Sequence, residues 1–298
     1  MIINPVLEKE LKTRMRGWKT PLLITSYLLF LGLVVFFGFL SSNIASRYSM
    51  NSFSPVTALG VYNILAVFQL LLVIFITPAL TAASVSGERE RQTLDLLLCT
   101  NLTSFSVIAG KVVVAIAQVM LLVAASLPVM GIVFFYGGVR ATDLLILFGF
   151  YLVTAVMLGS MGAFFSTLFK RSATATIISY ITVLALIIGT PVLYGIWSSV
   201  YYPVYQKTPQ YYHQLLFMFG NPLFGFSSVV EGQDMSYFMG NFISVGYYGG
   251  PGSQSGTLMW VQPWMANLIF DVVAAACFVR LAAWRLNPVR RRRRSKSK

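Results

Sequence analysis

The sequence has little charge, little cysteine and almost no histidine. Of its 298 residues, 10% are charged, two are cysteine and one is histidine. The two cysteines, Cys99 and Cys277, lie far apart in the chain, which argues against a disulfide framework. With His213 as the only histidine, the residues also argue against a transition-metal site. We expect His213 to be a side chain of the membrane interface and not a ligand.

Nucleotide-binding and hydrolytic motifs are also missing. The chain contains no GxGxxG, HExxH, CxxC or GxSxG pattern. Its Gly110-Lys111 pair lacks both the upstream glycine and the following hydroxyl residue of a Walker A motif. We therefore expect the chain to be no enzyme by itself and to bind no cofactor or metal.

Apolar residues dominate what is present. They make up 57% of the chain, and the mean hydropathy is +0.74, above the range of an ordinary soluble domain. About 20 helical residues cross a bilayer, and apolar runs of that length recur, without the alternation that a membrane barrel needs. The sequence predicts an all-α polytopic membrane protein with a single transmembrane domain of six spans, at about 21–40, 61–83, 107–136, 142–169, 173–197 and 260–284.

The basic residues predict the orientation of these spans. If both termini lie in the cytoplasm, 19 of the 22 lysines and arginines fall on the cytoplasmic side. The other three are Arg47, Arg140 and Lys207. This distribution follows the positive-inside rule, so we expect a multi-pass protein of the cell membrane with cytoplasmic termini.

Two basic segments flank the spans. Residues 2–19 open with Asn4-Pro5, a capping residue followed by proline, and continue as an amphipathic pattern, which predicts a helix on the inner leaflet. Residues 285–298 form a basic tail. Its arginine run, 290–294, either fixes the orientation of the last span or also contacts anionic lipid.

A charged insert, 86–104, separates the second and third spans. We expect Ser86 to cap a short helix whose first turn holds Glu88 and Glu90, near the positive end of the helix dipole. Arg91 and Asp95 are spaced for an i,i+4 pair, and Asn101 and Ser104 are expected to end the insert. The pattern indicates a docking surface for a partner in the water phase, with these candidate residues: Glu88, Arg89, Glu90, Arg91, Thr93 and Asp95.

Other features describe the helix packing. Small residues of the fourth span (Gly159, Gly162 and Ala163) predict a close helix contact, and prolines predict kinks in three spans (Pro78, Pro128 and Pro191). Only Lys170-Arg171 links the fourth and fifth spans, so these should form an antiparallel hairpin. Residues 198–259 form a tyrosine-rich external segment, in which one or two short interfacial helices are expected.

Among the polar side chains inside the predicted spans, four are candidates for a functional role: Gln69, Gln118, Asn267 and Asp271. Asn267 and Asp271 are one turn apart and should point into the bundle. The four side chains either line a substrate path or form hydrogen-bonded clusters that only hold helices together.

Several segments together resemble the permease of ABC-2-type ATP-binding-cassette transporters. Residues 86–100, SGERERQTLDLLLCT, and 108–111, IAGK, are similar to the family's segment between the second and third spans. Residues 4–10, NPVLEKE, resemble its amphipathic elbow helix, and 165–180 resemble its hairpin between the fourth and fifth spans.

The resemblance implies a half-transporter. A second permease chain, identical or related, would complete the membrane domain, and separate ATPase subunits would bind ATP and Mg²⁺. Residues 86–100 would be the coupling helix that docks into the ATPase, and export would be the usual direction. Two alternatives remain from the residues themselves: a self-contained secondary transporter using Asp271, and a membrane scaffold or sensor that transports nothing.

Overall fold

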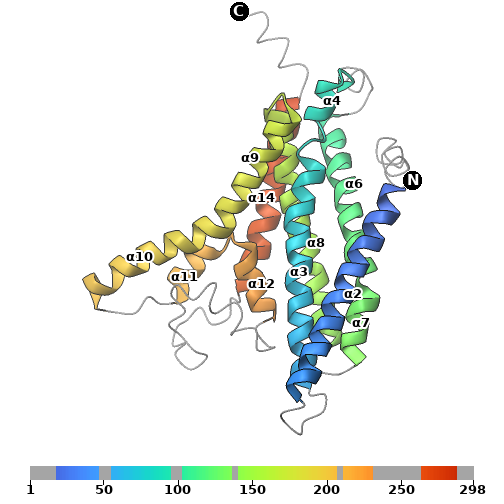
Figure 1. Cartoon of the computed structure of the whole chain (residues 1–298). Helices are drawn as coiled ribbons and strands as arrows, with labels where there is room; N and C mark the ends of the chain where they lie inside the picture. The colour runs from blue at the N-terminus through green and yellow to red at the C-terminus, as the bar shows by residue number, and fades with distance from the viewer. Residues whose placement is uncertain are drawn as a thin grey trace, which may run out of the picture.

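The computed structural model describes residues 18–46, 55–94, 103–135, 140–206, 211–230 and 263–286. These residues form helices and short connections, with no strand among them (Figure 1). The helices are α2 (Lys19–Ser46), α3 (Pro55–Thr81), α4 (Ser86–Glu90), α6 (Ser104–Ala125), α7 (Leu127–Phe135), α8 (Ala141–Leu168), α9 (Ser172–Leu184), the π-helical segment η1 (Ala185–Gly189), α10 (Thr190–Tyr205), α11 (Tyr211–Met218), α12 (Pro222–Val230) and α14 (Pro263–Leu286).

Six helical stretches are long and apolar enough to cross a membrane. They are α2, α3, α6 with α7, α8, α9 with α10, and α14, which confirms the predicted class of a six-span all-α membrane protein. The first turn of α2, the last turn of α14 and the short helix α4 lie at the same end of the bundle (Figure 1). The predicted elbow helix, up to residue 17, and the basic tail from residue 287 lie outside the described residues.

Helix α8 lies at the centre and packs against α14, α3, α6 and α9. Its small residues admit α3, as the sequence predicts. A Cβ at Gly159 would come within 3.4 Å of Thr77 Cγ2, and a Cβ at Gly162 would overlap Thr81 Oγ1. Because a bilayer gives helices no hydrophobic reason to associate, such close backbone approach is a main source of packing energy.

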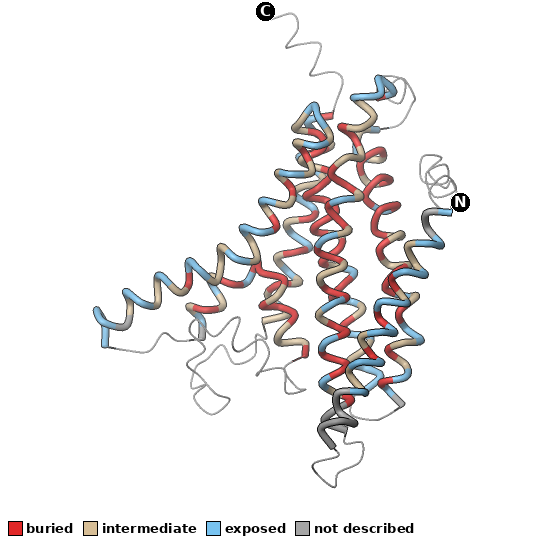
Figure 2. Tube along the Cα trace, viewed as in Figure 1, coloured by how far each residue is buried: buried red, intermediate tan, exposed pale blue. Residues whose placement is uncertain are grey.

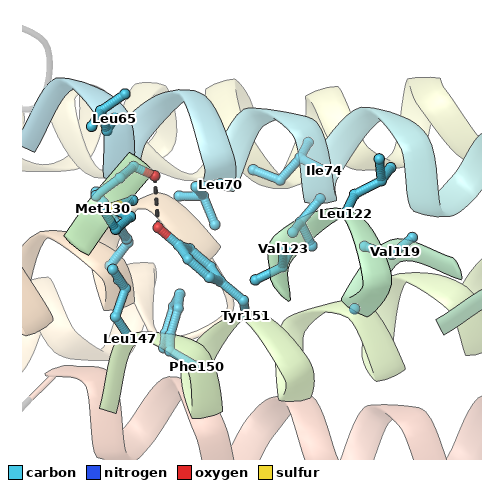
Figure 3. Packing of buried hydrophobic residues seen from close by; sticks show 14 of the residues in the cluster. Leu65, Leu70, Ile74, Val119, Leu122, Val123, Met130, Leu147, Phe150 and Tyr151 are labelled. Carbon is cyan, nitrogen blue, oxygen red and sulfur yellow. Dashed lines mark hydrogen bonds between the residues drawn. The ribbon is translucent and has the colours of Figure 1, made fainter. Parts of the chain in front are cut away.

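The core between α3, α6, α7 and α8 holds a completely buried tyrosine of α8. Tyr151 is 0% exposed, and its hydroxyl donates a hydrogen bond of 2.7 Å to the carbonyl oxygen of Ala66 on α3. Leu70, Val123 and Met130 surround the ring (Figure 3). A tyrosine can be fully buried here because its one polar group has a partner.

Two of the three predicted proline sites coincide with helix interruptions. Near Pro128, α6 ends at Ala125 and α7 begins at Leu127. At this break, Gln69 Nε2 donates to the Val123 carbonyl oxygen (3.2 Å) and to Ser126 Oγ (2.7 Å). Helix α3, by contrast, continues through Pro78.

The second interruption, at Pro191, is accompanied by the π-helical segment η1, which the sequence did not predict. Pro191 has no N–H, so the carbonyl of Ile187 loses its usual donor four residues later. Asn221 replaces that donor: its Nδ2 lies 3.1 Å from Ile187 O and 2.9 Å from Thr190 Oγ1. The Oδ1 of Asn221 accepts from the N–H of Leu223 (2.9 Å), which caps α12. Asn221 thus joins the fifth span to α12.

Helices α9 and α10 lean away from the bundle, and α11 and α12 lie between them and the bundle core (Figure 1). Two short helices therefore occur where the sequence predicts one or two. In the most apolar 18-residue stretch of α9–α10, only 11% of the residues are buried. The share is the same in α2, whereas it is 56% in α8 (Figure 2). The first and fifth spans thus expose long apolar faces.

Candidate functional site

The charged insert begins with a short helix. Helix α4 covers five residues, and Gln92, with a φ of 58°, takes the left-handed conformation that ends it. The N–H and hydroxyl of Thr93 then donate back to the Glu88 carbonyl oxygen, at 3.0 and 3.3 Å. This closes the segment 86–93 into a compact turn.

Two details of the predicted insert are wrong. Ser86 is the first helical residue and not the cap, because its hydroxyl donates to the Ala82 carbonyl oxygen, at 3.2 Å. Ser104 does not end the insert but begins α6, where Thr103 is the cap and its Oγ1 accepts from the N–H of Ser106 at 3.3 Å. The third span thus starts three residues earlier than predicted.

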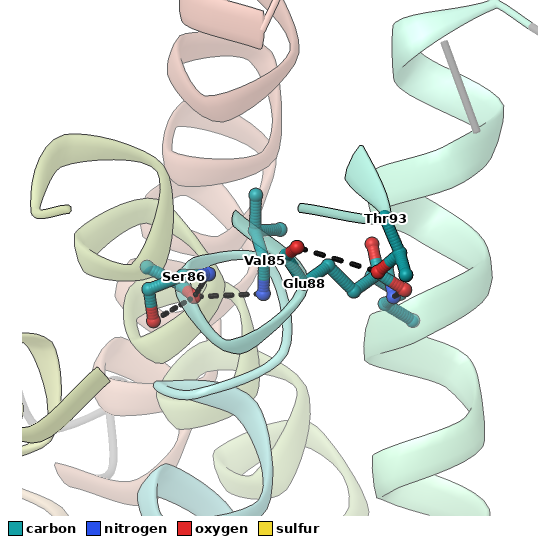
Figure 4. Close-up of polar contacts among 6 residues, drawn as sticks. Val85, Ser86, Glu88 and Thr93 are labelled. Carbon is teal, nitrogen blue, oxygen red and sulfur yellow. Dashed lines mark hydrogen bonds and ion pairs between the residues drawn. The ribbon is translucent and has the colours of Figure 1, made fainter. Parts of the chain in front are cut away.

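The start of α4 is fixed to the end of α8 by one side chain. Ser166 Oγ accepts hydrogen bonds from the N–H groups of Val85 and Ser86, each 2.9 Å long (Figure 4). The first N–H groups of a helix have no partner within the helix, so they need one from outside. The serine supplies it only because Gly162, one turn earlier on α8, lets α3 come close.

Glu88 forms a partly buried ion pair. Its Oε1 lies 2.6 Å from Nζ of Lys111 on α6. The Lys111 side chain is 3% exposed, whereas Glu88 is 24% exposed. A lysine so far from water requires a counter-charge, so this pair fixes α4 against the third span.

Arg89 and Glu90 bind the corner between α8 and α9. The guanidinium of Arg89 donates to the carbonyl oxygens of Phe169 (3.2 Å) and Thr167 (3.4 Å), at the end of α8. The carboxylate of Glu90 accepts from the hydroxyl (2.6 Å) and the N–H (2.8 Å) of Ser172, at the start of α9. We name this pair the Arg89/Glu90 clamp.

The clamp matches the helix dipoles, since a cation faces a C-terminus and an anion faces an N-terminus. The Ser172 hydroxyl, and after it the Ser172 N–H, lower the pKa of the Glu90 carboxyl below its ordinary value. Glu90 therefore stays ionised throughout the neutral pH range.

Of the remaining candidate docking residues, two are exposed and one lies outside the described residues. Arg91 and Thr93 are exposed, together with Gln92, and form the tip of the turn. Leu94 is 2% exposed and packs in a cluster with Val85, Ala163 and Leu286. Asp95, and with it the predicted Arg91–Asp95 pair, lies outside the described residues. A docking role for the segment stays a prediction.

The four candidate polar residues inside the spans have different surroundings, and their role stays a prediction. Gln69 bonds at the break between α6 and α7, and Gln118 is only partly buried. Asn267 and Asp271 are both 0% exposed on one face of α14, as predicted. Nδ2 of Asn267 donates to the Phe219 carbonyl oxygen at 2.9 Å, and Asp271 accepts from Thr154 on α8 at 3.3 Å.

Sequence reasoning missed the partners of these groups: Thr154, Ser126 and Ser166. Hydroxyl residues are common in membrane helices and usually bond to their own helix backbone, so their type alone carries no signal. A hydroxyl one or two turns from a small-residue pair, as at Ser166, is the only pattern that could have singled one out.

A metal site in the described residues would need several ligating side chains close together. No group of three histidine, cysteine, aspartate or glutamate side chains lies together there. His213 packs among aromatic rings, with ring centroids 3.9 Å from Tyr212 and 4.8 Å from Trp197. Its placement at the membrane interface stays a prediction.

Comparison with known protein families gives a match. The sequence model of the family described as ABC-2 family transporter protein matches residues 4–287. No curated protein matches the chain. The match covers nearly the whole chain, including α4 and all six spans, so the chain belongs to the ABC-2 family of transporter proteins.

Proposed function

We propose that this chain is the permease subunit of an ATP-driven exporter whose ATP is hydrolysed by separate subunits docked on the α4 segment. The observation that carries the proposal is the construction of that segment. Its tip, residues 91–93, is exposed, while its base is bonded to the third, fourth and fifth spans. ATP and Mg²⁺ would bind the partner subunits, because this chain has no motif for them.

The contacts at the base give a physical route for coupling. A displacement of the tip acts on α6 through the Glu88–Lys111 pair, on α8 through Ser166 and on the α8–α9 corner through the Arg89/Glu90 clamp. Each contact consists of charge-assisted hydrogen bonds or of two hydrogen bonds to one side chain, and such bonds are strong and short in range. The segment therefore moves as one body with three spans instead of bending independently of them.

A second permease chain is the other partner we propose. The first and fifth spans leave most of their apolar surface outside the bundle, with Ile181, Ile188 and Ile196 each more than half exposed. Small residues and long apolar faces allow helix association in a bilayer, and the pairing can be between identical or related chains.

The basic residues and the external tyrosines bear on the orientation and on the substrate. The distribution of the basic residues favours a plasma-membrane protein with α4 and both termini in the cytoplasm. ATP hydrolysed on that side and the family's usual direction favour export. The tyrosine-rich external segment favours a lipid-like or otherwise amphipathic substrate.

The proposal is tested by purifying the tagged chain in mild detergent and identifying what accompanies it by mass spectrometry. We expect a stoichiometric subunit with a Walker motif, and we expect Arg91→Glu to remove it. Gln206→Glu, an exposed change at the far end of α10, is the matched control and should retain it.

A chain that purifies alone in several detergents would contradict the proposal. It would favour the secondary transporter, for which the buried Asp271 is the specific observation. An ATPase that binds the chain but hydrolyses ATP at the same rate with and without it would favour the scaffold or sensor.

A further inference from the structure

Two polar side chains lie on the buried face of α14, and a glycine of α12 leaves room for one of them. Gly225 of α12 faces Asn267, and a Cβ on that glycine would come within 2.7 Å of Asn267 Oδ1 and 2.8 Å of its Cβ. Asp271 follows one turn later, against α8. Both residues are 0% exposed.

The hydrogen bonds of the two side chains define which of their atoms are free. Nδ2 of Asn267 donates to the Phe219 carbonyl oxygen, which accepts only, so the amide orientation is fixed and Oδ1 faces elsewhere. Thr154 donates its hydroxyl hydrogen to Oδ2 of Asp271. Oδ1 of Asn267 and Oδ1 of Asp271 are both buried and have no partner among the described residues.

Asn267 Oδ1 and Asp271 Oδ1 lie on adjacent turns of α14, and one hydrogen atom between them would give both a hydrogen bond. Residues four apart on a helix have Cβ atoms about 5–6 Å from each other, a spacing at which Asp and Asn side chains bond. A hydrogen on Asp271 Oδ1 would change that atom into a donor and give both acceptors a partner. A carboxylate in this position would instead leave a charge and two lone acceptors in an apolar interior.

We propose that Asp271 is a proton-binding site: in this packing of the bundle it is a neutral carboxylic acid whose Oδ1–H donates to Asn267 Oδ1. The proton comes from water and returns to water, so no other reactant is needed. This goes beyond transport driven by a partner ATPase and does not depend on it.

The charged and titratable groups on the neighbouring helices support a neutral Asp271. On α8, Tyr151 gives its hydroxyl hydrogen to a carbonyl oxygen of α3. On α6, Lys111 is paired with Glu88 at the end of the bundle near α4. The residues of α12 include no titratable side chain, and Arg280 of α14 is exposed, more than two turns from Asp271. None of them supplies a counter-charge to a carboxylate.

The site links proton binding to helix packing. Asp271 is 0% exposed and α14 packs against α8, α12 and α6, so water can reach its side chain only when α14 separates from these helices. Separation would hydrate the carboxyl and favour release of its proton, and renewed packing would require its uptake. Opening of this interface should therefore release one proton per chain.

The test is infrared spectroscopy of the purified protein at neutral pH, in a detergent without ester groups. We expect the C=O stretch of a protonated carboxyl that shifts in D₂O, is lost in Asp271→Asn and persists in Asp143→Asn, an aspartate at the start of α8. Asn267→Leu should move the band to higher frequency, because the O–H then lacks its acceptor.

A wild-type spectrum without this band would overturn the proposal, as would a band that survives Asp271→Asn. If that variant does not insert, wild-type protein with ¹³C-carboxyl aspartate decides: the band must move to lower frequency, and an unmoved band refutes the assignment. If Asp143→Asn removes the band that moves on ¹³C labelling, the proton is on Asp143, and this result refutes the proposal too.

Discussion

The Glu88–Lys111 pair allows a quantitative prediction because its two members differ in burial. Lys111 is 3% exposed and Glu88 is 24% exposed, with 2.6 Å between the charged atoms. Removing Glu88 leaves an ammonium group that water cannot reach. Removing Lys111 leaves a carboxylate that water can partly hydrate.

The free energies of unfolding should reflect this asymmetry. Glu88→Gln should destabilise the protein by about 3–5 kcal/mol, the range for a buried charge that loses its partner. Lys111→Met keeps the volume and the apolar stem of the side chain, and should cost about 1 kcal/mol, as for a partly exposed pair. In the double variant no buried charge remains, so its loss should be close to that of Lys111→Met alone. The magnitude of the coupling free energy is then about 3–5 kcal/mol.

The four proteins can be compared by denaturation in mixed micelles, followed by tryptophan fluorescence. Equal losses for the two single variants would refute the reasoning, since they would show that burial of the lysine has no effect. Additive losses in the double variant would refute it too, because they would mean that the two charges do not interact.

Three further predictions concern the packing of α8, the fifth span and the clamp. Gly162→Ala should destabilise by about 1–3 kcal/mol because its Cβ overlaps the end of α3, whereas Gly149→Ala, with open space on the same helix, should be neutral or stabilising in the same denaturation assay. Asn221→Ala loses two bonds to the fifth span and one helix cap, and should cost about 2 kcal/mol, against no measurable change for the exposed Ser199→Ala. Glu90→Gln should speed amide hydrogen exchange at the start of α9. In wild type the same acceleration should appear only as the pH falls below the ordinary glutamate range, because the lowered pKa keeps Glu90 ionised above it. Acceleration already at neutral pH, or none in the variant, would contradict the role of the clamp.

The number of spans and their packing face could be predicted from the sequence because both depend on local patterns. Apolar runs of sufficient length define spans wherever they occur, and the spacing of Gly159 and Gly162 places them on one face of a helix. The same local rule correctly placed Asn267 and Asp271 together on the buried side of α14.

Partners distant in the chain could not be predicted in this way. The sequence suggested that the charges of the insert face water, with Arg91 paired to Asp95, since i,i+4 spacing is the only pairing that a local pattern reveals. In the structure, Glu88 and Glu90 bond to residues 23 and 82 positions away. Those contacts depend on how several helices pack against one another, which is a property of the assembled bundle.

The π-helical segment in the fifth span was missed for a similar reason. Pro191 indicated an interruption, but its form depends on a donor from another part of the chain. Asn221 supplies that donor to the Ile187 carbonyl oxygen, and nothing in the sequence around Pro191 reports it.

The claim that the exposed tip of the α4 segment receives an ATPase is tested most directly by photo-crosslinking in intact cells. A benzoyl-phenylalanine in place of Gln92 lies at that tip, and one in place of the exposed Thr142 lies at the opposite end of the bundle. We predict that the probe at residue 92 captures a subunit with a Walker motif and that the probe at residue 142 does not. Equal capture at both positions, or capture of no ATPase at residue 92 in a correctly inserted chain, would contradict the account.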